Sequence, residues 1–519
     1  MAMQWLSFFQ KKSPRRVTLG IALLKGMKAI VGVLSVMVMA RYFGISLARD
    51  QWVVALTILT GLIQFAFGPM NETFRSKLAL IRSKSDSQEH FRETAASTIK
   101  WMFLFSLIVS LFCIPFVDQL ISAFGYVRSG SAFEALRLLL LISLPTLVLS
   151  EITTLISGVL NLYGVFFIPE LCGVLGVLVN TVIVALFANS LGVYSLWLGY
   201  LLNLLILSVV LALQFGITRI GFRRVLFAGF RGFKECFVFS SAMYLPLIFA
   251  QLSVLTERVI AARIGVGNVA GLDYARKILD VPMGVVTTSI ATVLGPILAD
   301  QFGKKNLTSL YEETARVARM MILGVTPPLL VFFVAPEVFI RLLLKRGLFD
   351  EQAVALTAGL LRLYTPGVLG AILLIAIGQA MMASGRLSRL VLATIIIQGG
   401  IIAGNIFLSP YLRVYAFPLS WSAMHLLVGG VLLLGIASES KQTGLGLVEA
   451  VVLALGLGAL FSSLRFVMNT NSSSFLLLVI GAGSLAVLIS VRCLGFKEEN
   501  AILQKVTQKL FQRWKSDAS

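Results

Sequence analysis

The chain has 519 residues, of which 58% are hydrophobic and 13% are charged. This composition and a mean hydropathy of +0.91 exclude an ordinary soluble domain. A formal net charge of +20 would suit a nucleic-acid-binding protein. The basic residues, however, lie in loops between apolar runs, which is typical of membrane topology and of contact with anionic headgroups.

Apolar runs of roughly 20 residues, enough to cross ~30 Å of hydrocarbon, recur along the whole chain. They predict an all-α polytopic membrane protein with about 14 transmembrane helices. The candidate spans are 17–40, 52–68, 101–117, 136–158, 165–188, 193–215, 237–262, 282–299, 318–343, 354–383, 387–408, 414–436, 446–467 and 474–492.

The basic N-terminus precedes an apolar stretch that is too long for a signal-peptide core, so we expect a retained first span. Lys and Arg concentrate in the loops on the side of the N-terminus. By the positive-inside rule this side is cytoplasmic, and an even number of spans then places both termini there.

A repeat of about 221 residues is visible in Gly and Pro positions. Its matched pairs are Pro145 with Pro366, Gly158 with Gly378, Gly164 with Gly385, and Arg41 with Arg263. Each repeat holds six spans, so the halves are predicted to be six-helix bundles related by a pseudo-two-fold along the membrane normal, with the substrate route between them.

The predicted domains follow from this repeat. They are an N-terminal six-helix bundle (1–216), a basic cytoplasmic linker with the composition of an amphipathic helix (217–236), a C-terminal six-helix bundle (237–436), two extra transmembrane helices (437–492) and a basic cytoplasmic tail (493–519).

The sequence carries no enzyme motif: it has no Gly-rich phosphate loop, Walker lysine, serine elbow or paired His ligands. The four Cys and two His are scattered, with no metal-site spacing. We therefore expect no catalytic residue, metal or cofactor. Without an ATP site, transport would draw on a coupling cation, the membrane potential or the substrate gradient.

Ionisable residues inside spans are the candidates for function, because charge beside hydrocarbon is costly. Lys25 and Lys28 share one face of the first helix, and Lys28 falls roughly at midplane. They either face a polar cavity or, in a tilted or later-starting helix, lie near the inner interface. Lys25 and Lys28 are predicted substrate-binding residues.

The segment 257–284 carries a second charged group. Glu257 and Arg258 are adjacent, point about 100° apart and are expected to be poor partners for each other. Arg276, Lys277 and Asp280 open the next span, where they either serve function or form a solvated helix rim. Arg258 and Lys277 are predicted to bind substrate, with Glu257, Arg276 and Asp280 as gate or counter-charge residues.

Two lone carboxylates, Glu151 and Glu170, lie in the fourth and fifth spans. They either bind a coupling cation or proton or hydrogen-bond to a neighbouring helix. Positive charge outweighs negative charge among the interior candidates. Such an interior suits an anionic cargo, for example a pyrophosphate headgroup, and argues against an exporter of organic cations.

Three runs resemble the MviN/MurJ family of lipid II flippases, within the multidrug/oligosaccharidyl-lipid/polysaccharide exporter superfamily. They are ARYFGISLARDQWVVALTI at 40–58, GNVAGLDYARKILDVPMGVVTTSIATVLGPIL at 267–298 and LLLKRGLFDEQAVALTAGLLRLYTPG at 342–367. The resemblance implies a V-shaped pair of bundles in the bacterial inner membrane. By alternating access, they would move an undecaprenyl-pyrophosphate-linked glycan from the cytoplasmic to the periplasmic leaflet.

The resemblance also assigns residues. Lys277 falls where the family carries an essential basic residue, and Asp50 where it carries an acid, here expected at the outer rim as a gate residue. The two extra spans would form a groove for the polyprenyl tail. The expected partners are the lipid-linked glycan, membrane lipids and glycan-synthesis proteins, with no nucleic acid.

The sequence departs from the family at the first two spans. Lys25 and Lys28 replace the two arginines that the family's peptidoglycan flippases typically carry there, and are out of register with them. Gln64 is followed by GPMNETF instead of the usual glutamate–glycine sequence. A flippase for another lipid-linked oligosaccharide, of exopolysaccharide or O-antigen type, therefore stays open. A small-molecule or drug antiporter on the same fold and a non-transporting scaffold are the further alternatives.

Overall fold

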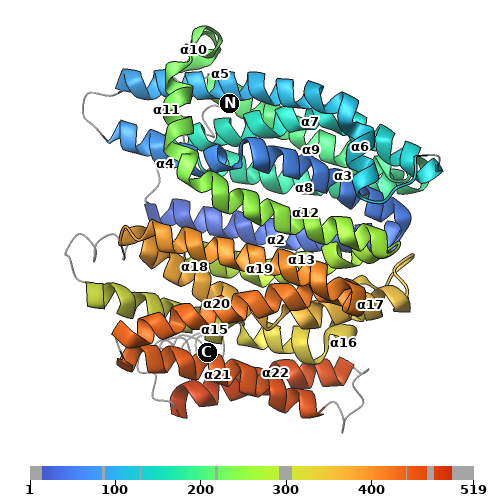
Figure 1. The fold of residues 1–519 in the computed structure, drawn as a ribbon, viewed down its shortest axis with the longest axis vertical. Coiled ribbons are helices and arrows are strands. Elements are labelled where there is room, and N and C mark those ends of the chain that lie inside the picture. The colour runs from blue at the N-terminus through green and yellow to red at the C-terminus, as the bar shows by residue number, and fades with distance from the viewer. Residues whose placement is uncertain are drawn as a thin grey trace, which may run out of the picture. The chain divides into compact units, whose positions relative to one another are not determined.

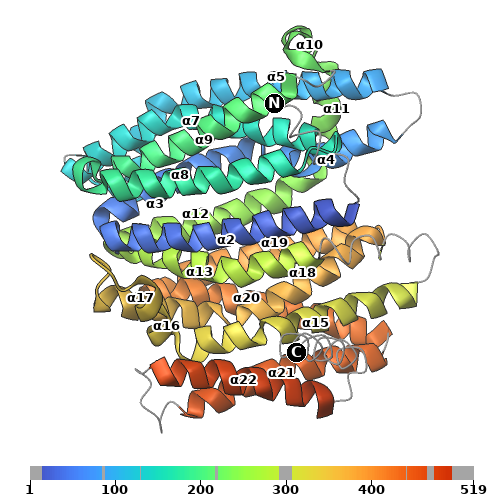
Figure 2. The same ribbon diagram turned by 180° about the vertical axis from the view of Figure 1, so that it is seen from behind.

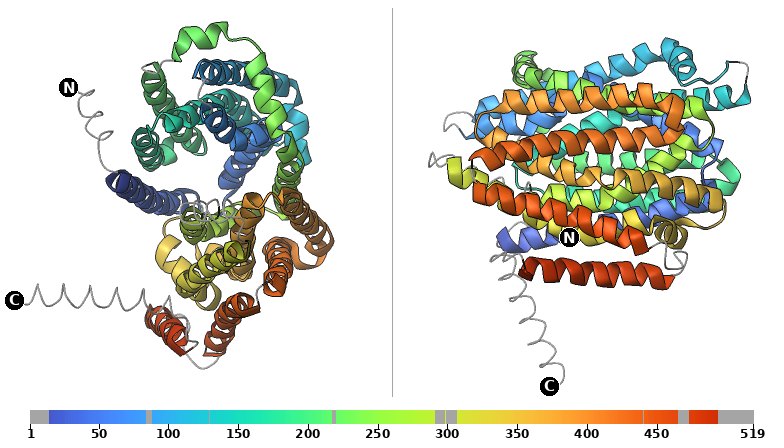
Figure 3. Two further views of the ribbon diagram at one scale, coloured as in Figure 1. Left: turned by 90° about the vertical axis from the view of Figure 1, so that its left-hand side faces the viewer. Right: turned by 60° about the horizontal axis from the view of Figure 1, so that its bottom comes forward.

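The computed structural model describes residues 14–83, 88–128, 130–216, 220–290, 298, 307–439, 441–464 and 473–493. Within these ranges every regular element is a helix, which confirms the predicted all-α class (Figures 1 and 2). The chain divides into two compact units, Met1–Tyr274 with Leu344–Ala353, and Ala275–Leu343 with Val354–Ser519. Figure 3 gives two further views of the helices.

The first unit contains the helices up to α12 and the start of α13. They are α2 (Pro14–Phe43), α3 (Leu47–Ala66), α4 (Gly68–Arg82), α5 (Gln88–Cys113), η1 (Ile114–Phe116), α6 (Val117–Ala123), α7 (Ser131–Leu162), α8 (Phe167–Leu191), α9 (Tyr194–Gly216), α10 (Gly221–Phe227), α11 (Arg231–Ser240), η2 (Ser241–Met243), α12 (Tyr244–Ile264) and α13 (Asn268–Ser289).

The second unit contains most of α13 and the helices that follow it. They are α15 (Leu307–Val334), α16 (Pro336–Leu344), α17 (Glu351–Tyr364), α18 (Gly367–Ala383), α19 (Leu387–Leu412), η4 (Arg413–Tyr415), α20 (Ala416–Glu439), α21 (Lys441–Leu464) and α22 (Ser473–Cys493). The predicted division into two six-helix bundles and a linker at 217–236 stays a prediction. The boundary between the compact units falls after Tyr274, inside α13.

Nine helices in the described ranges are long and apolar enough to cross a membrane, or up to eleven if each of two bent pairs is one span. One of the nine, Leu387–Gly435, is 49 residues long. It turns at Arg413, and α19 and α20 pack against each other, so this segment supplies two of the predicted spans. The count of fourteen stays a prediction, since much of 282–299 lies outside the described residues.

The sequence repeat recurs in the backbone at helix ends. After α7, Gly164 has φ +81° and Val165 N donates to Leu160 O at 3.0 Å. After α18, Gly385 has φ +72° and Arg386 N donates to Met381 O at 2.8 Å. Both ends form the same glycine-dependent C-cap, in which the left-handed residue lets the next amide reach back to the helix.

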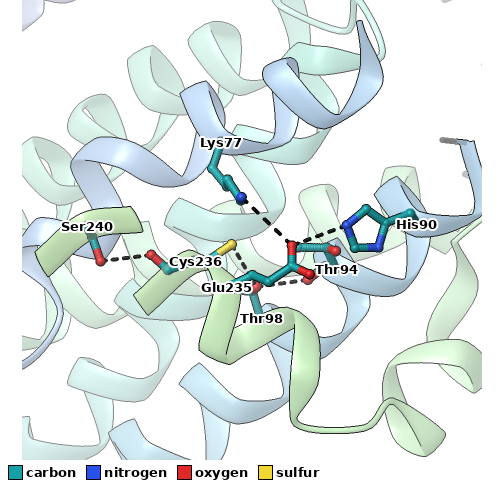
Figure 4. A network of polar contacts seen from close by, with 7 residues as sticks. All are labelled: Lys77, His90, Thr94, Thr98, Glu235, Cys236 and Ser240. Atoms are coloured by element: carbon teal, nitrogen blue, oxygen red, sulfur yellow. Dashed lines mark hydrogen bonds and ion pairs between the residues drawn. The ribbon is translucent and has the colours of Figure 1, made fainter. Parts of the chain in front are cut away.

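The segment α10–α11 is anchored on α4 and α5 by polar contacts (Figure 4). Glu235 of α11 accepts from His90 Nε2 at 3.2 Å and lies 3.8 Å from Lys77 Nζ. Ser97 Oγ donates to Gly229 O at 2.6 Å and accepts from Phe233 N at 2.9 Å. This part of the predicted linker therefore belongs structurally to the first unit.

Candidate functional site

A polar cavity of about 580 Å³ lies inside the first unit, among α2, the α3–α4 pair, α7, α8 and α9. Its polar lining residues are Lys28, Thr60, Gln64, Asn71, Glu72, Arg75, Ser150, Glu151, Thr153, Thr154, Ser157, Asn161, Glu170 and Tyr200. A cavity this polar within apolar helices can hold a hydrated or charged group away from hydrocarbon.

The bend between α3 and α4 brings polar residues to this cavity. The two helices meet at 50°, with Gly68 and Pro69 opening α4. Proline cannot continue the hydrogen-bond ladder of α3, so the chain changes direction there. Gln64 lies at the end of the first helix, while Asn71 and Arg75 lie on the second, four residues apart on one face.

Two cations of the cavity lie against glycines. A Cβ added to Gly173 of α8 would stand 3.2 Å from Lys28 Nζ, and a Cβ added to Gly158 of α7 would stand 3.2 Å from Arg75 Cγ. The missing side chains therefore leave room for the ammonium and for the arginine stem. Both cationic side chains belong to exposed residues, so their charged groups are accessible to a solute.

The acids of the cavity differ in burial. Glu151 is 1% exposed, and Asn71 Nδ2 donates to its Oε1 at 3.2 Å and its Oε2 at 3.1 Å. Glu170 is half-buried and Glu72 is exposed. Glu151 is thus held inside the protein, while the other two carboxylates are open to solvent or solute.

The structure therefore brings Lys28, Glu151 and Glu170 to one cavity. Lys25 is exposed on α2 and is not among the residues that line it. Arg276, Lys277 and Asp280 belong to the second unit. There, Arg276 Nε donates to Tyr364 Oη at 3.1 Å, Lys277 is half-buried and Asp280 is exposed.

Asp50 belongs to a separate buried cluster, which we call the α3–α13 clamp: Arg49, Asp50, Glu257, Arg258, Asp273 and Tyr274. Asp50 is 2% exposed and accepts from Gly267 N at 2.5 Å and Ala270 N at 2.7 Å. These amides belong to the N-terminal end of α13, where a carboxylate satisfies free donors and the helix dipole. Asp50 thus caps a helix that starts more than 200 residues later.

Two arginines complete the clamp. Arg49 is fully buried, donates from Nη2 to Asp273 Oδ2 at 2.5 Å and stacks on the Tyr274 ring, 5.3 Å from its centroid. Arg258 donates from Nη1 to Val269 O at 2.9 Å. Its Nε lies 3.7 Å from Glu257 Oε1, so these neighbours do form an ion pair, though at a distance longer than a hydrogen bond.

The loop residue Tyr126 adds a protonated group near the clamp. Burial raises the pKa of its phenol well above the usual value, and the negative charge of Asp50 raises it further. The phenol therefore stays neutral across the physiological pH range.

Sequence reasoning missed Arg49, Asn71 and Arg75. Arg49 and Asp50 are a basic and an acidic residue side by side at the start of a helix, and only Asp50 was predicted as a site residue. Asn71 and Arg75 follow the GP pair of GPMNETF, and a Pro-induced bend is the feature that directs them to the cavity.

An apolar pocket of about 280 Å³ lies in the second unit, between α15, the α17–α18 junction and α21. Leu329, Leu330, Phe333, Leu369 and Leu455 contribute its apolar walls. Such a surface suits a hydrocarbon chain and offers little to a charged group.

Comparison with solved structures shows the fold. The chain is similar to "Lipid II flippase MurJ, inward closed conformation", with a TM-score of 0.76 at 18% identity over 92% of this chain and 98% of that one. It is also similar to an inward-facing multidrug resistance transporter of the MATE family in the MOP superfamily, with a TM-score of 0.65 at 16% identity, covering 80% of this chain and 95% of that one.

Comparison of sequences shows the family. The chain is 26% identical over 358 residues to "Lipid II flippase MurJ" of Burkholderia cenocepacia, covering 66% of this chain and 68% of the relative. It is 24% identical over 359 residues to "Probable lipid II flippase MurJ" of Borreliella burgdorferi, covering 66% and 67%. The family model described as "Lipid II flippase MurJ" matches residues 39–483. This multi-pass membrane protein belongs to the MurJ lipid II flippase family.

Proposed function

We propose that the protein translocates lipid II, an undecaprenyl-pyrophosphate-linked glycan, from the cytoplasmic to the periplasmic leaflet of the bacterial inner membrane by alternating access. The observation that carries the proposal is the polar cavity with Lys28 and Arg75, in a chain of the lipid II flippase family. A flippase needs a polar compartment for the headgroup inside a protein that otherwise faces lipid.

The cavity offers the chemistry that a pyrophosphate requires. The Arg75 guanidinium can donate two parallel hydrogen bonds to phosphate oxygens, and the Lys28 ammonium supplies a compact second charge. Amide groups of Gln64 and Asn161 on the same lining are suited to sugar hydroxyls and peptide groups. In the absence of cargo, the carboxylates of Glu72 and Glu170 balance the two cations.

The predicted site residues outside the cavity are assigned roles according to their contacts in the structure. Asp50 and Glu257 act as gate residues, because the α3–α13 clamp joins helices whose separation would open one side. Arg258 serves this clamp as well, since the residue is 6% exposed and its guanidinium donates to a backbone carbonyl. Lys25 and Lys277 remain candidate headgroup contacts, with Arg276 and Asp280 as counter-charges.

The apolar pocket of the second unit would take part of the polyprenyl tail. Its walls come from α15, the α17–α18 junction, α18 and α21. A tail that enters it from the bilayer exchanges one apolar environment for another, so close van der Waals packing would hold it there. Polar headgroup and apolar tail would thus be accommodated by different parts of one chain, which a soluble cargo would not need.

A second candidate cargo is another lipid-linked oligosaccharide. It is favoured by the lysines at positions 25 and 28, because an ammonium does not bind phosphate or carboxylate groups with the bidentate geometry of arginine. The glycan would then differ while the pyrophosphate and the tail stay the same.

Native mass spectrometry of the purified protein tests this proposal. We expect a co-purifying or added undecaprenyl-pyrophosphate glycan whose mass identifies the sugar, with binding weakened in Lys28→Ala and Arg75→Ala. Removal of a charged hydrogen bond of about 1.5–3 kcal/mol weakens binding about tenfold to a hundredfold. Arg92→Ala, a half-buried position on α5 outside the cavity, is the control. Retention in both cavity variants, or no binding of added lipid II, would contradict the proposal.

A further inference from the structure

Glu151 is a buried carboxylate whose polar contacts in the described structure come from one neutral residue. Its side chain lines the cavity, is 1% exposed, and receives hydrogen bonds from Asn71 Nδ2. The described contacts give Glu151 no ion pair with Lys, Arg or His. A buried carboxylate without a paired cation is costly in its ionised form, so the site favours a neutral state of this side chain.

Asn71 can serve both protonation states of Glu151. As placed, its amide nitrogen donates to the carboxylate, while its buried Oδ1 has no hydrogen-bond partner within the described structure. A half-turn of the amide would bring Oδ1 to the carboxyl group, where it could accept the O–H of a protonated glutamic acid. The pair therefore has a satisfied arrangement with the proton and another without it.

The charged groups that face Glu151 across the cavity give this proton a role. Lys28 of α2 and Arg75 of α4 are the cations, Glu72 of α4 and Glu170 of α8 are the acids, and Tyr200 of α9 is the neutral titratable group. An anion bound to the two cations cancels positive potential that favours the ionised carboxylate. Anion binding therefore favours the proton on Glu151 and, by reciprocity, the proton favours the anion.

We propose that Glu151, with Asn71 as its reversible partner, is a proton-binding site that couples proton uptake to binding of an anionic headgroup in the same cavity. The proton comes from water in the cavity onto a carboxylate oxygen, and no bond other than hydrogen bonds changes. The coupling role rests on the proposed function, whereas the proton site itself does not.

The Glu151–Asn71 pair lies where its protonation state can affect the bend between α3 and α4. Asn71 lies three residues beyond Gly68, where α3 and α4 meet at 50°. Its bonds to Glu151 are hydrogen bonds between α4 and α7. Reversal of the amide changes what holds α4 on α7 directly beside the bend, so proton uptake biases the helix pair.

Infrared difference spectroscopy tests the proton site without any cargo. In acid-minus-alkaline spectra of the protein in nanodiscs, we expect a protonated-carboxyl band that disappears in Glu151→Gln and persists in Glu93→Gln, an exposed glutamate of α5. Asn71→Leu, which can satisfy neither state with a hydrogen bond, should shift the band. A spectrum unchanged by Glu151→Gln overturns the proposal, as does a band that Na⁺ displaces at constant pH, which would identify a sodium site.

Binding of undecaprenyl pyrophosphate tests the coupling. We expect the affinity of the wild type to rise as the pH falls, by at most about tenfold per pH unit for one linked proton. Glu151→Gln, which imitates the neutral acid, should bind undecaprenyl pyrophosphate tightly at every pH, once the pH dependence that comes from titration of the probe's own phosphate groups is subtracted. An equal pH dependence in both proteins overturns the coupling. No binding of the probe, with the infrared band lost in Glu151→Gln, overturns the proposed cargo and supports the proton site.

Discussion

The ammonium of Lys28 lies against the backbone of Gly173, close enough that a Cβ on this glycine would stand 3.2 Å from Nζ. The two residues come from α2 and α8, which pack along each other. A small residue on one helix thus determines where the cation of the other can lie. A substitution at Gly173 can therefore test whether the position of the Lys28 ammonium matters while the lysine itself is kept.

Gly173→Val should reduce transport while Lys28 stays in place in the sequence. The branched side chain occupies the space of the ammonium and displaces it from its present position, since contacts of about 3.2 Å leave no room for two methyl groups. We expect the cargo affinity to fall about tenfold. Binding of lipid II to the variant measures this.

Gly32→Val is the matched control, because Gly32 lies on α2 with nothing within 4 Å of an added Cβ. Equal loss of binding in both variants would show that Gly173 does not position Lys28.

Breaking the α3–α13 clamp should destabilise the protein strongly. Arg49→Met removes the ion pair between fully buried Arg49 and half-buried Asp273, and loss of one partner from a buried pair costs up to about 3–5 kcal/mol. Asp50→Ala removes the cap of α13, at a cost of about 0.5–2 kcal/mol. Thermal unfolding in detergent measures both effects.

The control for the clamp is Asp118→Asn, which breaks an ion pair with Arg137 whose side chains are 40% and 45% exposed. Such a pair contributes about 0–1 kcal/mol. If Asp118→Asn lowers the unfolding temperature as much as Arg49→Met does, burial does not determine how much the clamp contributes to stability.

Arg413→Gly should stabilise the protein. Arg413 ends α19 with φ +52° and ψ −131°, and Gly192, 221 residues earlier, ends α8 with φ +54° and ψ −133°. The first repeat has glycine at this turn, whereas the second holds an arginine in a region that costs a non-glycine residue about 1–3 kcal/mol. After the greater chain entropy of unfolded glycine is subtracted, we expect a gain of about 1 kcal/mol.

Arg413→Ala is the comparison, because it removes the exposed side chain and keeps the strained backbone. Its unfolding temperature should stay close to that of the wild type. Equal stabilisation by alanine and by glycine would show that the Arg413 side chain, and not its positive φ, causes the effect.

Ser97→Ala should loosen α11 from α5. The Ser97 hydroxyl donates to Gly229 O and accepts from Phe233 N, and the residue is 1% exposed. Its removal leaves the buried Phe233 amide without this acceptor, which costs about 1–3 kcal/mol, whereas Gly229 O keeps the hydrogen bond from Trp101 Nε1. Hydrogen exchange at the start of α11 should accelerate, whereas exposed Ser241→Ala should leave exchange unchanged. If the start of α11 exchanges as slowly in Ser97→Ala as in the wild type, Ser97 does not hold α11 on α5.

Apolar length and the repeat predicted much of the fold, because helix formation in a membrane depends on local sequence. Gly164 and Gly385 are a matched pair of the predicted repeat, and the backbone shows the same C-cap at both. Bends were harder to predict: Pro145 lies inside the continuous helix α7, whereas Pro69 opens α4 after a 50° change of direction. Neighbouring helices decide which proline interrupts a span.

The site was only partly predictable, since a sequence gives the residues of a helix but not the element that they face. Lys28 and Glu151 were predicted as interior charges and both line the cavity. Arg258 was predicted as a headgroup contact, which stays a prediction; in the structure its guanidinium donates to Val269 O in the α3–α13 clamp. The partner of Asp50, the start of α13, is more than 200 residues distant, and no local pattern reveals such a contact.

The most direct test of the central claim is translocation of lipid II by the purified protein in proteoliposomes. Lipid II placed in one leaflet is followed by its accessibility to an enzyme confined to the other side. We expect that the wild type moves lipid II, that Lys28→Ala with Arg75→Ala abolishes this movement, and that Arg92→Ala retains it. Movement at the wild-type rate in the double variant, or none in the correctly folded wild type, would contradict the proposed function.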